Sequence, residues 1–332
     1  MKQEISLSEL HAITRAALIA AGASEAAAKS VANSITNAER DGSVSHGFFR
    51  LPGYIASLES GKVNGCSEPE ISAMSAGVIC CDAKRGLAPY ALDCALPLLI
   101  KATKASGIAA LVVRNSAHFS SLWQEVEVLS DAGLVGIACT TYLPAVAPFG
   151  AKEKLFGTNP LAFAWPRPDA PPLVFDMATA AKALGDVQLA AQHGESLAPG
   201  IGQDKFGMPS VDPQEVLEGS LLPFGGYKGA ALSLIIELLA GALLGQKSSI
   251  STAEGDNGDG GPPPRGELII GIDPDLFSGG IWREEAEKLL MKLKSQQGLR
   301  LPGERRHARR MNAGKVSIDS ELMAKMRQRA GL

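Results

Sequence analysis

The chain has 332 residues, of which 45% are hydrophobic and 20% charged, a composition typical of soluble globular proteins. This length predicts two domains, or one large domain with an appendage. Its 32 basic and 35 acidic residues give a net charge of −3, which disfavours nucleic acid or a membrane as the partner. The first residues lack a signal-like apolar stretch, and five cysteines without CxxC spacing predict reduced thiols. We therefore expect a cytoplasmic protein.

Helical patterns occupy the first sixty residues. A Ser-x-x-Glu capping box at Ser6 predicts a helix over residues 6–22, and a second helix is predicted over 24–40. Ser45 is a suitable N-cap for a third helix that ends near residue 60. We expect a helical N-terminal unit over residues 1–68.

From residue 69 the hydrophobic pattern changes to alternating strand-like and helical runs, which predicts an α/β core over residues 69–282. The C-terminal segment 283–332, with two helices around a basic run, is expected to join the helical unit. In chain order the predicted elements are a hairpin at 71–83, helix 88–105, strand 108–114, helix 120–132, strands 134–141, 161–165 and 173–175, helix 178–192, a largely buried helix 228–244, a mobile surface loop 246–265, strand 267–272, and helices from about 283 and 318.

The segment Asp41–Arg50 (DGSVSHGFFR) gathers two hydroxyls, an imidazole and a guanidinium group. If Ser45 caps a helix, His46 and Arg50 are four residues apart and lie on one helical face. A proton-transferring imidazole and a carboxylate-binding guanidinium would then face one space. The alternative is a simple cap followed by a surface histidine.

Four further segments are candidates for a site. His118 follows a predicted strand and precedes a helix, where ligands collect in α/β proteins. Thr158 lies in a tight polar turn, and Asp176 stands at a strand end, where capping alone would also explain it. Asp186 follows Gly185 inside a predicted helix that both residues weaken, so we expect some other interaction to select it.

Several cofactor signatures are missing. No GxGxxG follows a predicted strand and no Walker-type loop is present, so a Rossmann nucleotide site is disfavoured. HExxH and paired-cysteine patterns are also missing, and we expect no metal site.

Six motifs together resemble the malate/lactate dehydrogenase type-2 family, which includes malate, sulfolactate and ureidoglycolate dehydrogenases. Within that family the chain is most similar to the Δ1-piperideine-2-carboxylate/Δ1-pyrroline-2-carboxylate reductases. The motifs are RDGSVSHGFFRLPGY, SAHFSSLW, LFGTNPLAF, VFDMATAA, GDVQLAA and LLPFGGYKGAALS. The resemblance extends almost from end to end of the chain, and it is specific because the motifs occur as a set.

The resemblance implies a non-Rossmann, three-layer α/β core with a mixed sheet, of the sulfolactate dehydrogenase type, and a homodimer. It implies that NADPH, or alternatively NADH, reduces a small-molecule substrate. It assigns His46 as proton donor with Ser45 and Asp186 as relay partners, and Arg50 and Thr158 as substrate-binding residues. The cofactor-binding segments that it implies are His118, Phe119, Ser120, Ser121 and Leu122; Asp176, Met177 and Ala178; Tyr227 and Lys228; and Arg305 and Arg306.

Asp186 decides between two substrate classes. Many hydroxy-acid members of the family have Arg-Gly-Lys where this chain has Leu184-Gly185-Asp186. A carboxylate stabilises the cation of a protonated cyclic imine, whereas a lysine opposes it. The sequence therefore favours reduction of an imine 2-carboxylate to proline or pipecolate, with a 2-hydroxy-acid dehydrogenase as the alternative. A non-catalytic ligand-binding protein with the same fold is a third possibility.

Overall fold

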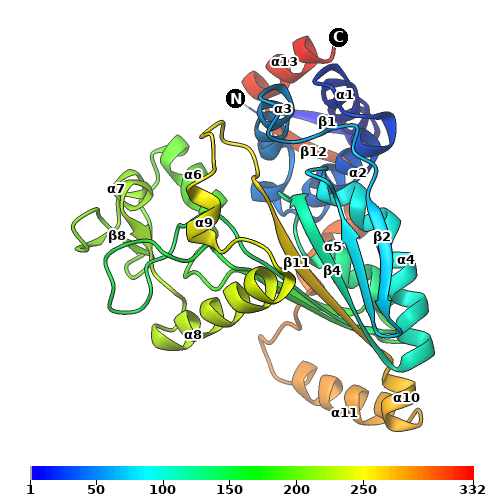
Figure 1. Ribbon diagram of the computed structural model, residues 1–332. Coiled ribbons are helices and arrows are strands. Elements are labelled where there is room, and N and C mark those ends of the chain that lie inside the picture. Colours follow the sequence, from blue (N-terminus) through cyan, green and yellow to red (C-terminus); the bar gives the residue numbers. More distant parts are fainter. Residues whose placement is uncertain (1) are drawn as a thin grey trace.

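The computed structural model of the protein describes residues 2–332 and is built around one seven-stranded mixed sheet (Figure 1). The strand order is β2-β3-β4-β11-β5-β6-β7; β3 and β4 are parallel, and the other neighbouring pairs are antiparallel. This topology confirms the predicted mixed, non-Rossmann sheet. The strands are β2 (Glu70–Ser75), β3 (Val78–Asp82), β4 (Ile108–Ala117), β5 (Val135–Thr140), β6 (Leu161–Trp165), β7 (Leu173–Met177) and β11 (Pro264–Ile272).

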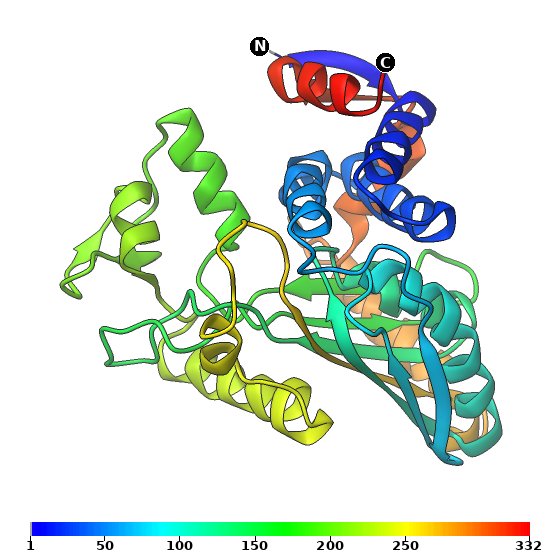
Figure 2. The same ribbon diagram turned by 45° about the horizontal axis from the view of Figure 1, so that its top comes forward.

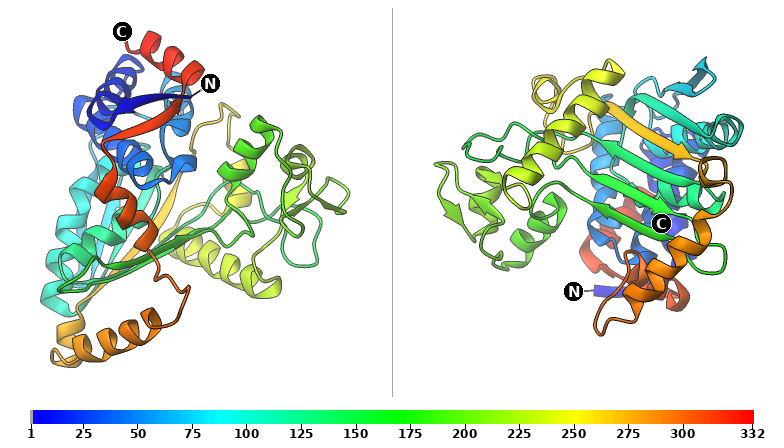
Figure 3. Two further views of the ribbon diagram at one scale, coloured as in Figure 1. Left: turned by 180° about the vertical axis from the view of Figure 1, so that it is seen from behind. Right: turned by 90° about the horizontal axis from the view of Figure 1, so that it is seen from below.

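Helices cover both faces of this sheet, which gives the three expected layers (Figure 3). Helices α4 (Ala88–Ser106) and α5 (Trp123–Asp131) bury one face through leucine, valine and alanine side chains. On the other face, α8 (Tyr227–Ile236) and its continuation pack Ile236, Ala240 and Leu244 against β5 and β11. Each strand alternates its side chains between these two layers.

The helical unit contains both ends of the chain. Helices α1 (Leu7–Ala20) and α2 (Glu25–Asp41) begin at the predicted serine caps, Ser6 and Ser24. The sequence did not predict that β1 (Lys2–Ser6) would pair with β12 (Lys315–Asp319), which brings the two termini together (Figure 1). The helix expected from residue 318 therefore starts at Ser320, as α13 (Ser320–Arg329), which packs on α1.

A small lobe with its own apolar core faces the helical unit across the edge of the sheet (Figure 2). It contains α6 (Leu184–His193), α7 (Pro213–Glu218) and three short strands, β8 (Gly202–Gln203), β9 (Pro209–Ser210) and β10 (Ser220–Leu221). The remaining helices are α9 (Ser249–Ala253), which lies inside the predicted surface loop, α10 (Pro274–Ser278), α11 (Trp282–Lys294) and α12 (Glu304–Asn312).

The prediction that Ser45 caps the third helix is wrong. Residues Val44–His46 and Phe48–Arg50 form two single 3₁₀ turns, and α3 (Leu51–Glu59) begins only afterwards. Gly47 separates the turns because its extended backbone (φ −92°, ψ −141°) interrupts helical hydrogen bonding. His46 and Arg50 therefore do not share one helical face.

Two other helices differ from their predictions. The helix expected over 178–192 starts at Leu184, because residues 179 and 181 bond to neighbouring loops, so Gly185 and Asp186 occupy its first turn and not its interior. The helix after Gly226 changes to a π-helical turn at Glu237–Gly241 and a 3₁₀ turn at Ala242–Leu244. It is also not largely buried; four apolar residues, Leu234, Ile235, Leu238 and Leu243, are 48–65% exposed. By length and composition alone, residues 227–244 meet the criterion for a membrane-spanning helix.

Candidate active site

A cavity of about 350 Å³ lies where the helical unit, the sheet and the small lobe meet. It receives side chains from the Asp41–Arg50 segment, from the end of β4, from β7 and from the first turn of α6. The predicted site residues that line it are Ser45, His46, Arg50, His118, Phe119, Ser120, Ser121, Leu122, Thr158, Asp176, Ala178, Asp186, Arg305 and Arg306. Distant parts of the sequence therefore converge on one space.

His46 and Arg50 enter the cavity from the two 3₁₀ turns. Ser45 Oγ lies 3.3 Å from His46 Nδ1, and Arg50 Nε donates a hydrogen bond of 2.7 Å to the Ser45 carbonyl oxygen. Burial, followed by the positive charge of Arg50 and the proximity of His118, lowers the pKa of His46 far below its ordinary value. In the absence of a ligand the imidazole is therefore neutral at pH 7.

The first turn of α6 approaches this pair closely. A Cβ atom on Gly185 would lie 2.6 Å from Arg50 Nη2 and 3.0 Å from Ser45 Cβ, so a side chain at this position would displace the Arg50 guanidinium group. Asp186 lies beside it, and its negative charge favours the charged form of Arg50. Within residues 2–332, the Asp186 carboxylate has no hydrogen bond to His46 or Ser45 and no ion pair. Its charge is therefore available to a ligand.

A buried trio lies behind the end of β4. His118 Nε2 is 2.8 Å from Glu125 Oε1 and 3.6 Å from Glu267 Oε2. Burial raises the pKa of Glu125 to about 8 and that of Glu267 well above its ordinary value, while it lowers the pKa of His118. The ligand atoms of this trio lie within 4.8 Å of one another, close enough to hold a metal ion. The raised carboxyl pKa values favour bound protons at neutral pH.

Thr158 reaches the cavity on a turn that is fixed by buried polar contacts. The next residue, Asn159, adopts positive φ (39°) and is fully buried. Its Nδ2 donates to Glu237 Oε1 at 2.8 Å and to the Ser233 carbonyl oxygen at 3.1 Å, both from the helix below. Thr179 N donates to the Thr158 carbonyl oxygen at 2.9 Å from the other side. These bonds offset the cost of the unusual backbone conformation.

Ser121, from a predicted cofactor segment, and Thr141, which was not predicted, each place in the cavity a polar group that lacks a partner in the part of the chain that the structure describes. Ser121 Oγ and Thr141 Oγ1 are buried without a hydrogen bond, and both residues line the cavity. Asp176 Oδ2 accepts a hydrogen bond of 3.1 Å from the backbone nitrogen of Trp123, at the start of α5. Buried polar atoms without partners are costly. These residues therefore fit a polar, elongated ligand such as a nicotinamide nucleotide.

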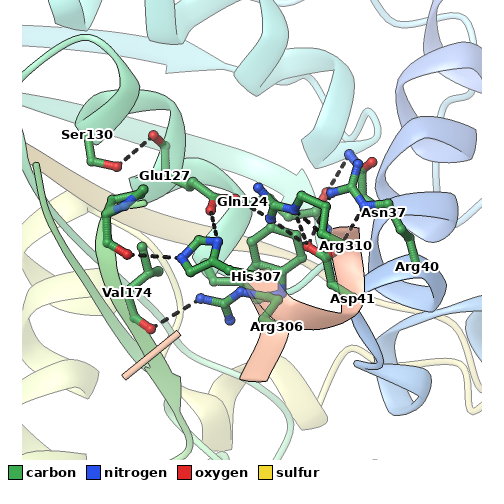
Figure 4. A network of polar contacts seen from close by, with 12 residues as sticks. Asn37, Arg40, Asp41, Gln124, Glu127, Ser130, Val174, Arg306, His307 and Arg310 are labelled. Atoms are coloured by element: carbon green, nitrogen blue, oxygen red, sulfur yellow. Dashed lines mark hydrogen bonds and ion pairs between the residues drawn. The ribbon is translucent and has the colours of Figure 1, made fainter. Parts of the chain in front are cut away.

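Helix α12 carries Arg305 and Arg306 to the cavity, and Figure 4 shows how it is fixed. Arg310 Nη2 lies 2.6 Å from Asp41 Oδ2 and 2.8 Å from Glu127 Oε2. Arg306 donates to the Val174 carbonyl oxygen at 3.2 Å, and its guanidinium carbon lies 4.5 Å from the centre of the Trp123 ring. Sequence analysis had left this helix as an undefined basic run.

Three predicted residues do not line this cavity. Met177 ends β7 with its side chain 39% exposed; Tyr227 and Lys228 begin α8, where the Tyr227 ring is 6.4 Å from that of Phe149. Conversely, sequence analysis missed Trp123, Tyr142 and Arg265, all of which line the cavity. The sequence contained one indication that Arg265 is functional. Arg265 and Glu267 are charged residues on either side of Gly266, at the start of a strand that is otherwise apolar.

Comparisons with known proteins agree with this architecture. The family model for malate/L-lactate dehydrogenase matches residues 5–327. The chain belongs to the malate/L-lactate dehydrogenase family. Its fold and the expected mixed three-layer core are those of this family, as the solved structures of members such as sulfolactate dehydrogenase from Methanocaldococcus jannaschii confirm (TM-score 0.88, 31% identity, covering 99% of this chain and 98% of the other).

Two of the proteins that are similar to this chain are named as imine reductases. The chain is 43% identical to a Δ1-pyrroline-2-carboxylate reductase from Ancylobacter novellus, and the alignment covers 97% of this chain and 96% of the other. The crystal structure of Δ1-piperideine-2-carboxylate reductase from Pseudomonas syringae superposes with a TM-score of 0.93 at 39% identity, covering 98% and 99% of the two chains. A (2R)-3-sulfolactate dehydrogenase (NADP(+)) from Chromohalobacter salexigens is 38% identical over 95% of this chain and 94% of the other. All three relatives are named as oxidoreductases, which supports an oxidoreductase activity for this chain.

Proposed function

We propose that this protein reduces a cyclic imine 2-carboxylate, Δ1-pyrroline-2-carboxylate or Δ1-piperideine-2-carboxylate, with NADPH to give L-proline or L-pipecolate. The relatives named for these substrates support the substrate class. The observation that carries the proposal within this chain is the unpaired carboxylate of Asp186, in a cavity that also holds Arg50. A cationic ring nitrogen and an anionic carboxylate on adjacent atoms of one substrate match these two charges.

An imine and a keto acid differ in the proton that each needs during reduction. A protonated imine carries its own proton, so hydride addition to carbon turns C=N⁺ directly into a neutral amine, which then takes up one proton. A keto acid instead needs a proton at oxygen during reduction. For an imine, His46 would orient the ring nitrogen and exchange protons with it from its place in the cavity beside Arg50.

The remaining roles follow from position. A dihydronicotinamide, when bound, supplies the hydride. We propose that the residues around Ser121, Asp176 and the start of α5 hold this cofactor, with Arg305 and Arg306 beside its phosphates. Arg50 binds the substrate carboxylate, and Thr158 closes the substrate side of the cavity.

The alternative function is dehydrogenation of a 2-hydroxy acid, which the sulfolactate dehydrogenase relative supports. The test is a substrate panel followed by NADPH absorbance: pyrroline-2-carboxylate, piperideine-2-carboxylate, pyruvate, oxaloacetate and 3-sulfopyruvate. The proposal expects kcat/KM for one of the two imines to exceed that for every keto acid by at least about 100-fold, which corresponds to roughly 3 kcal/mol of discrimination. A keto acid that is reduced faster than both imines would replace the proposed function by the alternative. Parallel assays with NADH settle the cofactor preference.

We also propose a cytoplasmic homodimer. The exposed apolar residues of α8 and its continuation, including Leu234 and Leu238, form the surface best suited to a second copy, because soluble monomers rarely leave such a stripe uncovered. Light scattering should give twice the monomer mass, and Leu238→Glu should shift it toward the monomer mass. A monomeric wild-type protein would contradict this assembly.

A further inference from the structure

Arg265 lies at the start of β11 and faces the cavity. It is 3% exposed, and the pairing of β11 with β4 shifts register between Arg265 and Glu267, as at a β-bulge. Bulges re-aim side chains at the rims of sheets. At the intervening Gly266, a Cβ atom would lie 2.1 Å from the Ala240 carbonyl oxygen, so the bulge requires glycine. The fold therefore directs this guanidinium group into the site.

The guanidinium group of Arg265 is incompletely satisfied. Its Nη2 donates to the His118 carbonyl oxygen, and its carbon lies 4.6 Å from the centre of the Tyr142 ring. Nε and Nη1 have no hydrogen-bond partner in residues 2–332, and no carboxylate there forms an ion pair with the group. Burial lowers its pKa to about 10, so it still carries its charge at neutral pH. The negative charge of Glu267 favours the charged form of Arg265, but no carboxylate in residues 2–332 forms an ion pair with it. A buried charge without an ion pair is costly, and a ligand anion would relieve that cost.

Arg265 and Arg50 are connected by an aromatic pair. The guanidinium carbon of Arg50 lies 4.9 Å from the centre of the Phe119 ring, and the Phe119 and Tyr142 ring centres are 6.0 Å apart. The positive charge of Arg50 disfavours the charged form of Arg265, and both residues line the same cavity. Among residues 2–332, four arginines (Arg50, Arg265, Arg305 and Arg306) and two carboxylates (Asp176 and Asp186) line the cavity. An anionic group is therefore missing between the two arginines.

We propose that Arg265 is a second substrate-binding residue that, together with Arg50, holds the carboxylate of the substrate. The identity of the ring rests on the proposed function, whereas the requirement for a carboxylate rests on the two arginines alone. In the proposed function, the phosphates of the nucleotide would instead lie beside Arg305 and Arg306 of α12, and Arg306 packs against Trp123. The Phe119 and Tyr142 rings, inclined to each other by 43° between Arg50 and Arg265, offer an aromatic wall for a small acid with a ring.

The test compares Arg265→Gln with Arg114→Gln, a matched control on the neighbouring strand that does not line the cavity. Calorimetry measures the binding of pyrrole-2-carboxylate, a planar acid that cannot be reduced, and of its uncharged amide. We expect Arg265→Gln to weaken binding of the acid about 10- to 100-fold, the usual loss for a charge-assisted hydrogen bond, and to change binding of the amide less than about threefold. KM for pyrroline-2-carboxylate should rise by a similar factor, and Arg114→Gln should change neither constant.

Ligand-free stability separates this role from a structural one. Because no carboxylate in residues 2–332 forms an ion pair with Arg265, Arg265→Gln should leave the melting temperature of the ligand-free protein unchanged or higher. A large fall in melting temperature in both Arg265→Gln and Arg265→Lys would make the residue part of the scaffold and overturn the proposal. So would unchanged affinity for the acid, an equal loss for the amide, or a loss confined to NADPH affinity. If the wild type reduces no imine but binds planar carboxylates through Arg265, the proposed function fails and this inference stands.

Discussion

Gly185 lies so close to Arg50 that a Cβ atom on the glycine would be 2.6 Å from Nη2 of the arginine. The small lobe and the helical unit therefore meet at a position where a side chain would have to displace the Arg50 guanidinium group. Gly185 follows the N-terminus of α6, where alanine would normally be the better helix former. Close approach, and not helix propensity, explains the glycine.

We predict that Gly185→Ala lowers kcat/KM about 10- to 100-fold, because the added methyl group displaces Arg50 or the first turn of α6 from the site. Steady-state kinetics with pyrroline-2-carboxylate measures the effect. Gly314→Ala is the control, since a Cβ atom at that glycine meets nothing within 4 Å. Equal kinetics for the two variants would mean that the contact between Gly185 and Arg50 is not needed for activity.

His46→Ala should lower kcat about 10²- to 10⁴-fold, the range expected when a proton-transferring group is lost. His193→Ala, at the exposed end of α6, serves as the control. Steady-state kinetics gives kcat for both variants, and circular dichroism establishes that both are folded. If His46→Ala retains more than about a third of wild-type turnover, the imidazole neither orients the imine nor carries its proton.

Glu39 gives the fold a pH dependence next to the site. Its Oε1 accepts a hydrogen bond of 2.7 Å from the Phe48 nitrogen, which holds the second 3₁₀ turn, and burial raises the pKa of Glu39 to about 7. The folded state therefore binds this proton more tightly than the unfolded state does. Its contribution to stability is complete below about pH 4.5 and is lost as the pH rises through 7.

Glu39→Gln should therefore raise the free energy of unfolding at pH 8 by on the order of 1 to 3 kcal/mol and leave it nearly unchanged at pH 4. Urea unfolding at the two pH values measures this difference, with Glu4→Gln on exposed β1 as the control. Equal effects of Glu39→Gln at both pH values would show that the carboxyl group titrates alike in the folded and unfolded states.

Local patterns predicted much of the fold. The serine caps at Ser6 and Ser24 placed α1 and α2, and the apolar runs placed the strands of the sheet within a few residues. The pairing of β1 with β12 was missed because its partners are separated by almost the whole chain, and no local signal records such a pairing. Gly47 was read as part of a helix, although its extended backbone divides the segment in two.

The site shows the same division between local and long-range information. His46, Arg50 and Asp186 were identified by motif, and the fold brings all three to one cavity. Asp186 was singled out because it was expected inside a helix that it would weaken, and that expectation was wrong. Asp186 stands in the first turn of α6, where an acidic residue is favourable. The charged residues around Gly266 mark Arg265 as unusual in the sequence, but its direction depends on a bulge in the pairing with β4, which no local pattern records.

Cofactor preference should depend on Arg305, which is exposed at the edge of the cavity. If its charge meets the 2′-phosphate of NADPH, Arg305→Ser should raise KM for NADPH about 10-fold or more and leave KM for NADH unchanged. Arg309→Ser, one turn later on α12 and outside the cavity lining, is the matched control. Equal changes toward NADPH and NADH would remove Arg305 from 2′-phosphate recognition.

Asp186→Asn tests the charge on which the choice of substrate class depends. The amide keeps the size of the side chain and removes its charge, and a helix first turn loses only about 0.3 to 1 kcal/mol by that change. Because Asp186 has no partner in the described chain, its charge should act mainly on the substrate cation. We expect kcat/KM for pyrroline-2-carboxylate to fall about 100-fold or more, and any activity on pyruvate, which has no cationic centre, to fall less. The decisive quantity is kcat/KM for pyrroline-2-carboxylate divided by kcat/KM for pyruvate, measured in the wild type and in the variant. A constant ratio would restrict Asp186 to orienting His46, and a ratio that rises in favour of the imine would refute the electrostatic argument for an iminium substrate.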